Sequence, residues 1–252
     1  MIYTHSLGRA RRYYPEAKAF AAAGKYSNFR ELHDRVRSIA GALSEHGFRV
    51  GHRLALLLPN ETDYIELIYA CAWLGVIVVP LNTRLAVSET DHILRDAKPR
   101  GLIRHSTLAV PTEQVSWELV LDKEPLNLAS DPAPEPVYAP DALFALIYTS
   151  GTTGLPKGVA LTHANILANV DHTNYWMRYR EGGVYLHAAP IFHIADFPLM
   201  FASPAFGTCQ TTIPKFSPQA FCETVERERV THTVVVPTML NMLTKFEDLK
   251  KY

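Results

Sequence analysis

The sequence predicts an α/β fold in which mostly parallel sheets are layered with helices. Two short apolar runs, Arg53–Leu58 and Val76–Val79, are typical of strands that are buried on both faces. Segments whose apolar residues recur with helical spacing lie between and around these runs. Alternation of buried strands with helices is the pattern of a parallel sheet whose strands are connected by helices.

The first half of the chain contains two predicted helices. In residues 28–46 the apolar side chains recur three and four positions apart, with Ser27 as the expected cap at the start and Gly47 at the end. Asn60 is expected to cap a second helix that runs to about Leu74, because its side chain can accept a hydrogen bond from the first turn.

A proline-rich stretch separates the two halves. Residues 125–140 hold five prolines and little hydrophobic pattern, which favours a surface crossover between two subdomains. We therefore expect a first α/β subdomain in residues 1–124 and a second in residues 141–252. In the second half, strands are predicted at 143–150, 184–188, 208–213 and 233–236, and helices at 163–177, 218–229 and 239–249. Ser217-Pro218 is a good helix start, since proline is tolerated in the first turn.

Composition excludes several classes of protein. The chain has 252 residues with 25 basic and 25 acidic side chains, so a general nucleic-acid binder, which carries a basic excess, is not expected. The basic and aromatic segment Arg9–Tyr14 is expected to be a solvated N-terminal segment. The longest apolar run, Leu67–Leu81, is shorter than the ~20 residues that a membrane-spanning helix needs. Three scattered cysteines form no disulfide framework, which favours a reducing compartment such as the cytoplasm.

The segment with the clearest chemistry is residues 148–159, a loop that follows an apolar strand. It contains four hydroxyl side chains, three glycines and one lysine: Thr149, Ser150, Thr152, Thr153, Gly151, Gly154, Gly158 and Lys157. Glycines allow successive amides to turn toward one point and bind an anion, and a lysine adds a point charge. This combination predicts a polyphosphate ligand.

The loop differs from the P-loop of common nucleotide-binding proteins. That motif requires a glycine and lysine followed by serine or threonine at the start of a helix. Here Pro156 precedes Lys157 and Gly158 follows it, and Val159–Leu161 has the pattern of a second strand. A helix is expected only after Thr162. We therefore expect a strand–loop–strand arrangement at the phosphates.

The segment Thr149-Ser-Gly-Thr-Thr-Gly-Leu-Pro-Lys-Gly158 closely resembles the signature loop of the adenylate-forming superfamily, in particular of acyl-CoA synthetases. Three other segments are similar to family motifs in the same order, namely residues 72–82, 190–196 and 231–239. The resemblance covers about residues 7–249 and implies the N-terminal subdomains of that fold.

The resemblance implies a two-step reaction. A carboxylic acid and ATP, with Mg²⁺, give an acyl-adenylate and pyrophosphate, and coenzyme A then displaces AMP to form a thioester. It implies that residues 149–154 and Lys157 hold the β- and γ-phosphates, with Lys157 and Thr152 as the catalytic candidates. This agrees with the chemistry, because the leaving pyrophosphate must be neutralised and positioned.

His193 is the candidate residue of the acid pocket. Relatives that activate amino acids typically have an aspartate after the phenylalanine to pair with the substrate ammonium, whereas here His193 follows Phe192. The resemblance thus favours an acyl or aryl acid, although Asp196 keeps an amino-acid substrate open. The histidines at 163, 172, 187 and 193 have no metal-binding spacing, and no metal ligand is assigned to the protein.

Family members continue well beyond the motifs present here, with segments that bind adenine, Mg²⁺ and ribose and with a small C-terminal domain. We therefore expect this chain to be the N-terminal portion of an acid–CoA ligase that is inactive in isolation. It would have a C-terminal partner chain or self-associate through uncovered apolar surface. The alternative is a non-catalytic module that retains the fold and binds a phosphate ligand or a complementary chain.

Overall fold

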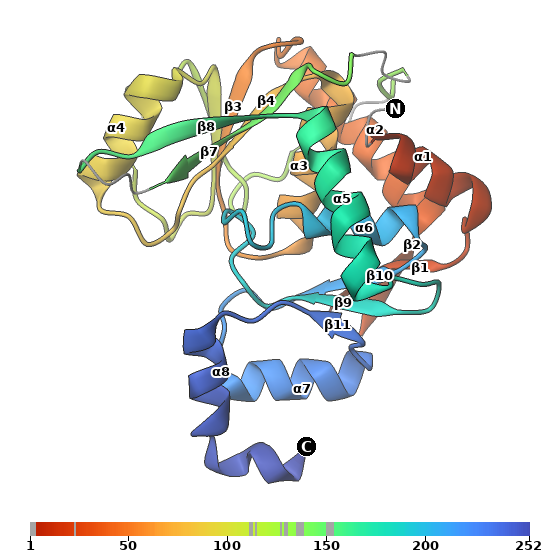
Figure 1. Cartoon of the computed structure of the whole chain (residues 1–252). Coiled ribbons are helices and arrows are strands. Elements are labelled where there is room, and N and C mark those ends of the chain that lie inside the picture. The colour runs from red at the N-terminus through yellow and green to blue at the C-terminus, as the bar shows by residue number, and fades with distance from the viewer. Residues whose placement is uncertain are drawn as a thin grey trace. The chain divides into compact units, whose positions relative to one another are not determined.

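A computed structural model describes residues 4–22, 24–110, 113, 115–126, 128, 131–134, 139–149 and 154–252. Within these residues the fold contains two mostly parallel sheets layered with helices, which confirms the predicted fold class (Figure 1). The chain divides into two compact units. The first comprises Asp34–Pro59 and Asp63–Leu167, and the second comprises His5–His33, Asn60–Thr62 and Ala168–Tyr252. Among the described residues, none of the helices is long and apolar enough to cross a membrane.

The first unit is built on a six-stranded sheet in the order β6-β5-β3-β4-β7-β8. Its strands are β3 (Arg53–Leu57), β4 (Ile77–Pro80), β5 (Gly101–Arg104), β6 (Trp117–Val120), β7 (Leu143–Thr149) and β8 (Lys157–Thr162). All neighbours are parallel except the last pair, because β7 and β8 form an antiparallel hairpin. The hairpin therefore places β8 at an edge of the sheet.

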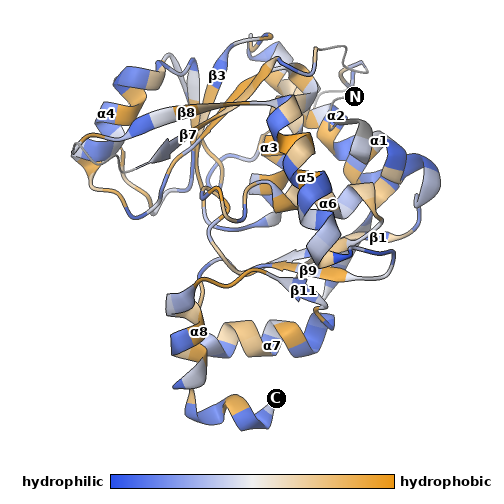
Figure 2. Ribbon diagram, viewed as in Figure 1, coloured by the Kyte–Doolittle hydropathy of each residue, from blue (hydrophilic) through white to orange (hydrophobic). Residues whose placement is uncertain are grey.

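Three helices accompany this sheet: α2 (Phe29–Glu45), α3 (Thr62–Leu74) and α4 (Val87–Ala97). In α3 every residue from Tyr64 to Trp73 is buried, as expected for a helix that is apolar on most sides. Helix α4 is amphipathic and packs Ile93 and Leu94 against apolar residues of β3, β4 and β5. Figure 2 shows the contrast between the hydrophobic α3 and the two-faced α4.

The second unit is built on a five-stranded sheet in the order β11-β9-β10-β1-β2. Its strands are β1 (Lys18–Ala22), β2 (Lys25–Asn28), β9 (Val184–His187), β10 (Cys209–Thr212) and β11 (His232–Thr233). Only β1 and β2 are antiparallel. Its helices are α1 (Thr4–Tyr13), α6 (Leu199–Ala205), α7 (Pro218–Glu228), α8 (Pro237–Thr244) and the short 3₁₀ helix η1 (Glu247–Lys251), and α5 (His163–Met177) spans both units. In Figure 1, α7 and α8 lie on one face of this sheet and α6 on the other.

The structure divides the chain differently from the expected boundary at residues 125–140. Strand β6 precedes this stretch and β7 follows it, yet both belong to the same sheet. The proline-rich stretch is therefore a connection within the first unit, and the loop-bearing hairpin is part of that unit. The described part of the stretch is bonded to helices of the same unit, since Arg37 Nε donates to Ala133 O and Trp73 Nε1 to Pro134 O.

Residues 9–13 belong to α1, which buries Leu7 and Ala10 but leaves Arg9, Arg11, Arg12 and Tyr13 exposed, as expected for a solvated segment. Two other local expectations were wrong. The cap of α2 is Asn28 instead of Ser27, because Asn28 Oδ1 accepts from Glu31 N while Glu31 Oε2 accepts from Asn28 N. Helix α8 begins two residues earlier than expected, at Pro237, and ends at Thr244.

Candidate functional site

The loop that is predicted to bind phosphate connects the two strands of the edge hairpin. Thr149 is the last residue of β7 and pairs directly with Lys157, the first residue of β8. This is the strand–loop–strand arrangement that the sequence predicted, and α5 starts only at His163. Of the predicted phosphate ligands, Thr149, Gly154 and Lys157 are described, whereas Ser150, Gly151, Thr152 and Thr153 lie outside the described residues. The roles of all these residues stay predictions.

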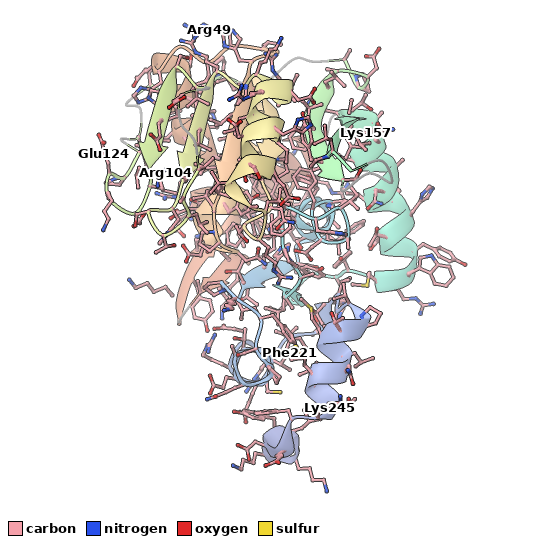
Figure 3. The ribbon with its side chains drawn as sticks, turned by 90° about the vertical axis from the view of Figure 1, so that its left-hand side faces the viewer. Arg49, Arg104, Glu124, Lys157, Phe221 and Lys245 are labelled. Atoms are coloured by element: carbon pink, nitrogen blue, oxygen red, sulfur yellow. The ribbon has the colours of Figure 1, made fainter. Side chains whose placement is uncertain are left out.

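Lys157 is placed to meet a ligand from solvent. Its side chain is exposed, as are those of the next residues of β8 (Figure 3). Within the part of the chain that the structure describes, its ammonium has no hydrogen-bond or ion-pair partner. Gly154 has a φ of +102°, a backbone conformation that favours glycine, and nothing lies within 4 Å of the position where a Cβ would be. The described end of the loop is thus open and cationic.

Helix α4 contacts the base of this loop on both sides. Tyr148 Oη, just before the loop, donates a hydrogen bond to Asp96 Oδ2 at 2.5 Å. His92 Nε2 lies 3.3 Å from the carbonyl oxygen of Pro156, just before Lys157. Burial raises the pKa of Tyr148, and Asp96 acts in the same direction, so the phenol keeps its proton and remains a donor.

His193, the candidate pocket residue, belongs to the second unit. It lies exposed in a turn where its backbone N–H donates to Pro190 O and its carbonyl accepts from Phe197 N. The N–H of Ala195 donates to His193 Nδ1 at 3.2 Å. This bond leaves the proton of the neutral ring on Nε2. Its role in an acid pocket stays a prediction.

Asp196 lies in the core of the second unit. Its side chain is completely buried, and its two oxygens accept hydrogen bonds from Tyr185 Oη and His187 Nδ1, each at 2.7 Å. On the other side of the ring, His187 Nε2 lies 3.0 Å from Gln210 Oε1. Burial raises the pKa of Tyr185 well above its ordinary value, so the phenol is a permanent donor. Both oxygens of this carboxylate are thus already engaged by internal donors.

Asn60 organises the start of the His193 turn, a role that the sequence analysis missed. Its side chain is buried and does not cap α3, which begins at Thr62. The amide donates to Ala189 O at 2.6 Å, and its oxygen accepts from Ile191 N at 3.0 Å. Two backbone groups that precede His193 are thereby satisfied by one side chain distant in the sequence. The residue type was informative, but local reasoning could only assign it to the nearest helix.

Metal ligands are not grouped in the described residues. No cluster of three histidine, cysteine, aspartate or glutamate side chains in these ranges could hold a metal ion.

The profile of the family described as "AMP-binding enzyme" matches residues 7–252. The chain belongs to this family. A feruloyl-CoA synthase of an Amycolatopsis species is 36% identical over 235 residues, which cover 92% of this chain and 48% of that protein.

Two solved structures of similar proteins agree with the assignment. The inhibitor-bound N-terminal domain of FACL13 from Mycobacterium tuberculosis has a TM-score of 0.89 and 26% identity, covering 99% of this chain and 66% of that one. The o-succinylbenzoate coenzyme A synthetase of Bacillus subtilis, solved in complex with ATP and a magnesium ion, has a TM-score of 0.82 and 28% identity. That match covers 96% of this chain and 51% of the other.

This AMP-binding chain spans about half the length of the curated relatives it matches. Those relatives include CoA ligases of aromatic and aliphatic acids. The family and the ligase class of its relatives are thus established.

Proposed function

We propose that this chain is the N-terminal portion of an ATP-dependent acid–CoA ligase and supplies its polyphosphate-binding loop. In the first step a carboxylate oxygen of the acid attacks the α-phosphorus of ATP, and the bond to the β-phosphate oxygen breaks to release pyrophosphate. In the second step the thiol of coenzyme A attacks the acyl carbon, loses its proton and releases AMP. The observation that carries the proposal is the exposed Lys157 paired with Thr149 at the mouth of a strand–loop–strand hairpin.

The loop would act on the leaving group. Lys157 would neutralise part of the charge that develops on pyrophosphate, and Thr149 with the hydroxyls of residues 150, 152 and 153 would donate hydrogen bonds to its oxygens. Bound Mg²⁺ would supply further charge neutralisation at the same oxygens. No covalent intermediate with the protein is required, so positioning and electrostatics account for the whole contribution of this loop.

The acid is proposed to lack an ammonium group. His193 provides no fixed anion in the turn assigned to the acid pocket, and the buried Asp196 is already bonded to Tyr185 and His187. A substrate ammonium would therefore enter an environment without a charge partner, which is costly. This supports acyl or aryl acids. The free, buried cysteines support a reducing location, which we propose to be the cytoplasm.

The first test is a titration of the purified chain with ATP and with pyrophosphate in a calorimeter. Lys157→Ala is expected to weaken either affinity by at least ~1 kcal/mol, about fivefold, because a charge-assisted bond is lost. Lys245→Ala is the matched control, since Lys245 is exposed in the other unit (Figure 3). Equal affinities for the two variants would show that the loop is not the phosphate site.

The second test separates the ligase from a phosphate-binding module. The chain spans about half of its relatives, so we expect the isolated chain to bind ATP without acid-dependent release of pyrophosphate. A coupled pyrophosphate assay with a panel of acyl and aryl acids measures this directly. Robust turnover would contradict the expected inactivity and would establish that the chain is a complete catalyst for adenylation.

A further inference from the structure

Helix α4 is bonded to the phosphate-binding loop although the proposed chemistry does not use it. His92 and Asp96 stand four residues apart on α4 and therefore project from the same face of the helix. Asp96 accepts from Tyr148 on the incoming strand of the loop, and His92 meets Pro156 at its outgoing end. Helix α4 thus holds both ends of the loop from one face.

The N-terminal end of the loop is fixed by Tyr148, whose side chain crosses the hairpin. Tyr148 and Gly158 are directly opposite each other in the β7–β8 register. A Cβ on Gly158 would lie 3.0 Å from Tyr148 Cζ and 3.2 Å from its hydroxyl, so the ring occupies the space that a side chain at 158 would fill. The ring also packs against the apolar cluster that contains Ile93 and Leu94 of α4. Gly158 therefore lets the phenol reach Asp96.

The outgoing end is fixed through a backbone carbonyl. Proline has no N–H, so the carbonyl of Pro156 is the only backbone hydrogen-bonding group of that residue. A carbonyl can only accept, and His92 Nε2 must therefore be the donor across the 3.3 Å separation. This bond orients the peptide that joins Pro156 to Lys157. The orientation of this peptide in turn sets the direction in which the side chain of Lys157 projects.

We propose that Tyr148, Asp96 and His92 are positioning residues that hold the loop ready to receive a polyphosphate. This rests on the proposed function of the loop. Because Tyr148 and Pro156 are already fixed by α4, less conformational freedom is lost at the two ends of the loop when a ligand binds, and the saving appears as affinity. Without these bonds the same lysine and hydroxyls would remain, but they would have to be ordered by the ligand.

The affinity test uses pyrophosphate and the full chain. Tyr148→Phe, which removes only the hydroxyl, and His92→Ala are each expected to weaken binding about fivefold, close to 1 kcal/mol. His92→Gln is expected to recover most of the loss, because its amide can donate to the same carbonyl. Asp91→Asn is the matched control on α4, since Asp91 pairs with Arg95. Urea denaturation of each variant shows whether a loss of affinity reflects only a loss of global stability.

A second measurement needs no ligand. Hydrogen exchange of peptides covering residues 145–162 is expected to quicken several-fold in Tyr148→Phe and His92→Ala, and to remain unchanged in Asp91→Asn. If the loop binds pyrophosphate through Lys157 while affinity and exchange are unaffected in both variants, the positioning role is overturned and the proposed function stands. If pyrophosphate does not bind but exchange quickens, the proposed function fails and the tether of the loop to α4 is retained.

Discussion

Asp196 is a candidate substrate ligand by its sequence position, but in the structure its carboxylate stabilises the core. Its carboxylate is completely buried and accepts from Tyr185 and His187, so it organises two polar side chains of strand β9 in the second unit. Buried donors that lose their acceptor keep the cost of desolvation without the compensating bond. Asp196 therefore stabilises the unit that contains the His193 turn.

Asp196→Ala is expected to lower the free energy of unfolding by about 3 kcal/mol, since two buried donors lose their acceptor. Urea denaturation monitored by circular dichroism measures this loss. Asp171→Ala is the matched control, because Asp171 is exposed on α5 in the same unit and should change stability by less than ~0.5 kcal/mol. Similar effects of the two substitutions would contradict a structural role for the buried carboxylate.

His163 makes stability depend on pH. Its side chain is buried against Phe144, and burial lowers its pKa from 6.5 to about 4. Between these values the unfolded chain binds a proton that the folded chain does not, so the free energy of unfolding falls as the pH falls. The expected contribution is a loss of about 2 kcal/mol between pH 7.5 and pH 5.

The chain has eleven histidines, so the contribution of His163 is measured by comparison with a variant. His163→Gln is expected to be less stable than the native chain at pH 7.5, and this deficit is expected to shrink by about 2 kcal/mol at pH 5. Denaturation curves at four or five pH values measure the difference. A deficit that stays constant over the range would show that His163 takes up its proton equally in both states.

At the scale of elements, the best predictions came from segments with both a periodic pattern and a local start signal. Helix α5 was predicted with its observed bounds, and α7 to within one residue. Helix α8 carries a similar start signal two residues before its predicted beginning, since Pro237 stands in its first turn as Pro218 does in α7. Helix α1 was missed because only Leu7 and Ala10 of its described residues form the buried stripe.

The cap of α7 offers an element-scale test. Ser217 Oγ accepts from Ala220 N at 3.1 Å, and α7 packs Phe221 and Val225 against the second unit's sheet. Ser217→Ala is expected to cost about 1 kcal/mol of unfolding free energy, whereas Ser217→Asp should retain the cap and gain from the helix dipole. Urea denaturation measures both. Equal loss in the two variants would show that the side-chain oxygen does not stabilise the helix.

At the scale of the whole molecule, the loop could be predicted because its chemistry lies in consecutive residues. The residues that support it could not be predicted in the same way. Asp96 and Tyr148 are separated by fifty-two positions, and Asn60 reaches the backbone at residues 189 and 191. The division into units was equally hidden, because the second unit is assembled from three separate segments of the chain. Such pairings are decided by packing, which a local pattern does not encode.

Surface composition leads to a last expectation, that the chain self-associates. Tyr175 and Trp176 at the end of α5 are 73% and 80% exposed, and their rings pack against each other with centroids 5.1 Å apart. The formal net charge of zero at pH 7 provides little electrostatic repulsion between copies. Exposed apolar side chains on a neutral protein favour association. We therefore expect the mean sedimentation coefficient to rise with concentration at pH 7.

Self-association through the aromatic pair can be distinguished from nonspecific aggregation by substitution. Replacing both residues, as Tyr175→Ser with Trp176→Ser, should lower the association measured by sedimentation velocity by several-fold. Val50→Ser is the matched control, because Val50 is also exposed, at 65%, but belongs to the first unit. If the control reduces association as much as the double variant, the contact is nonspecific. If neither does, apolar exposure at these positions does not drive self-association, and an aromatic interface between copies is excluded.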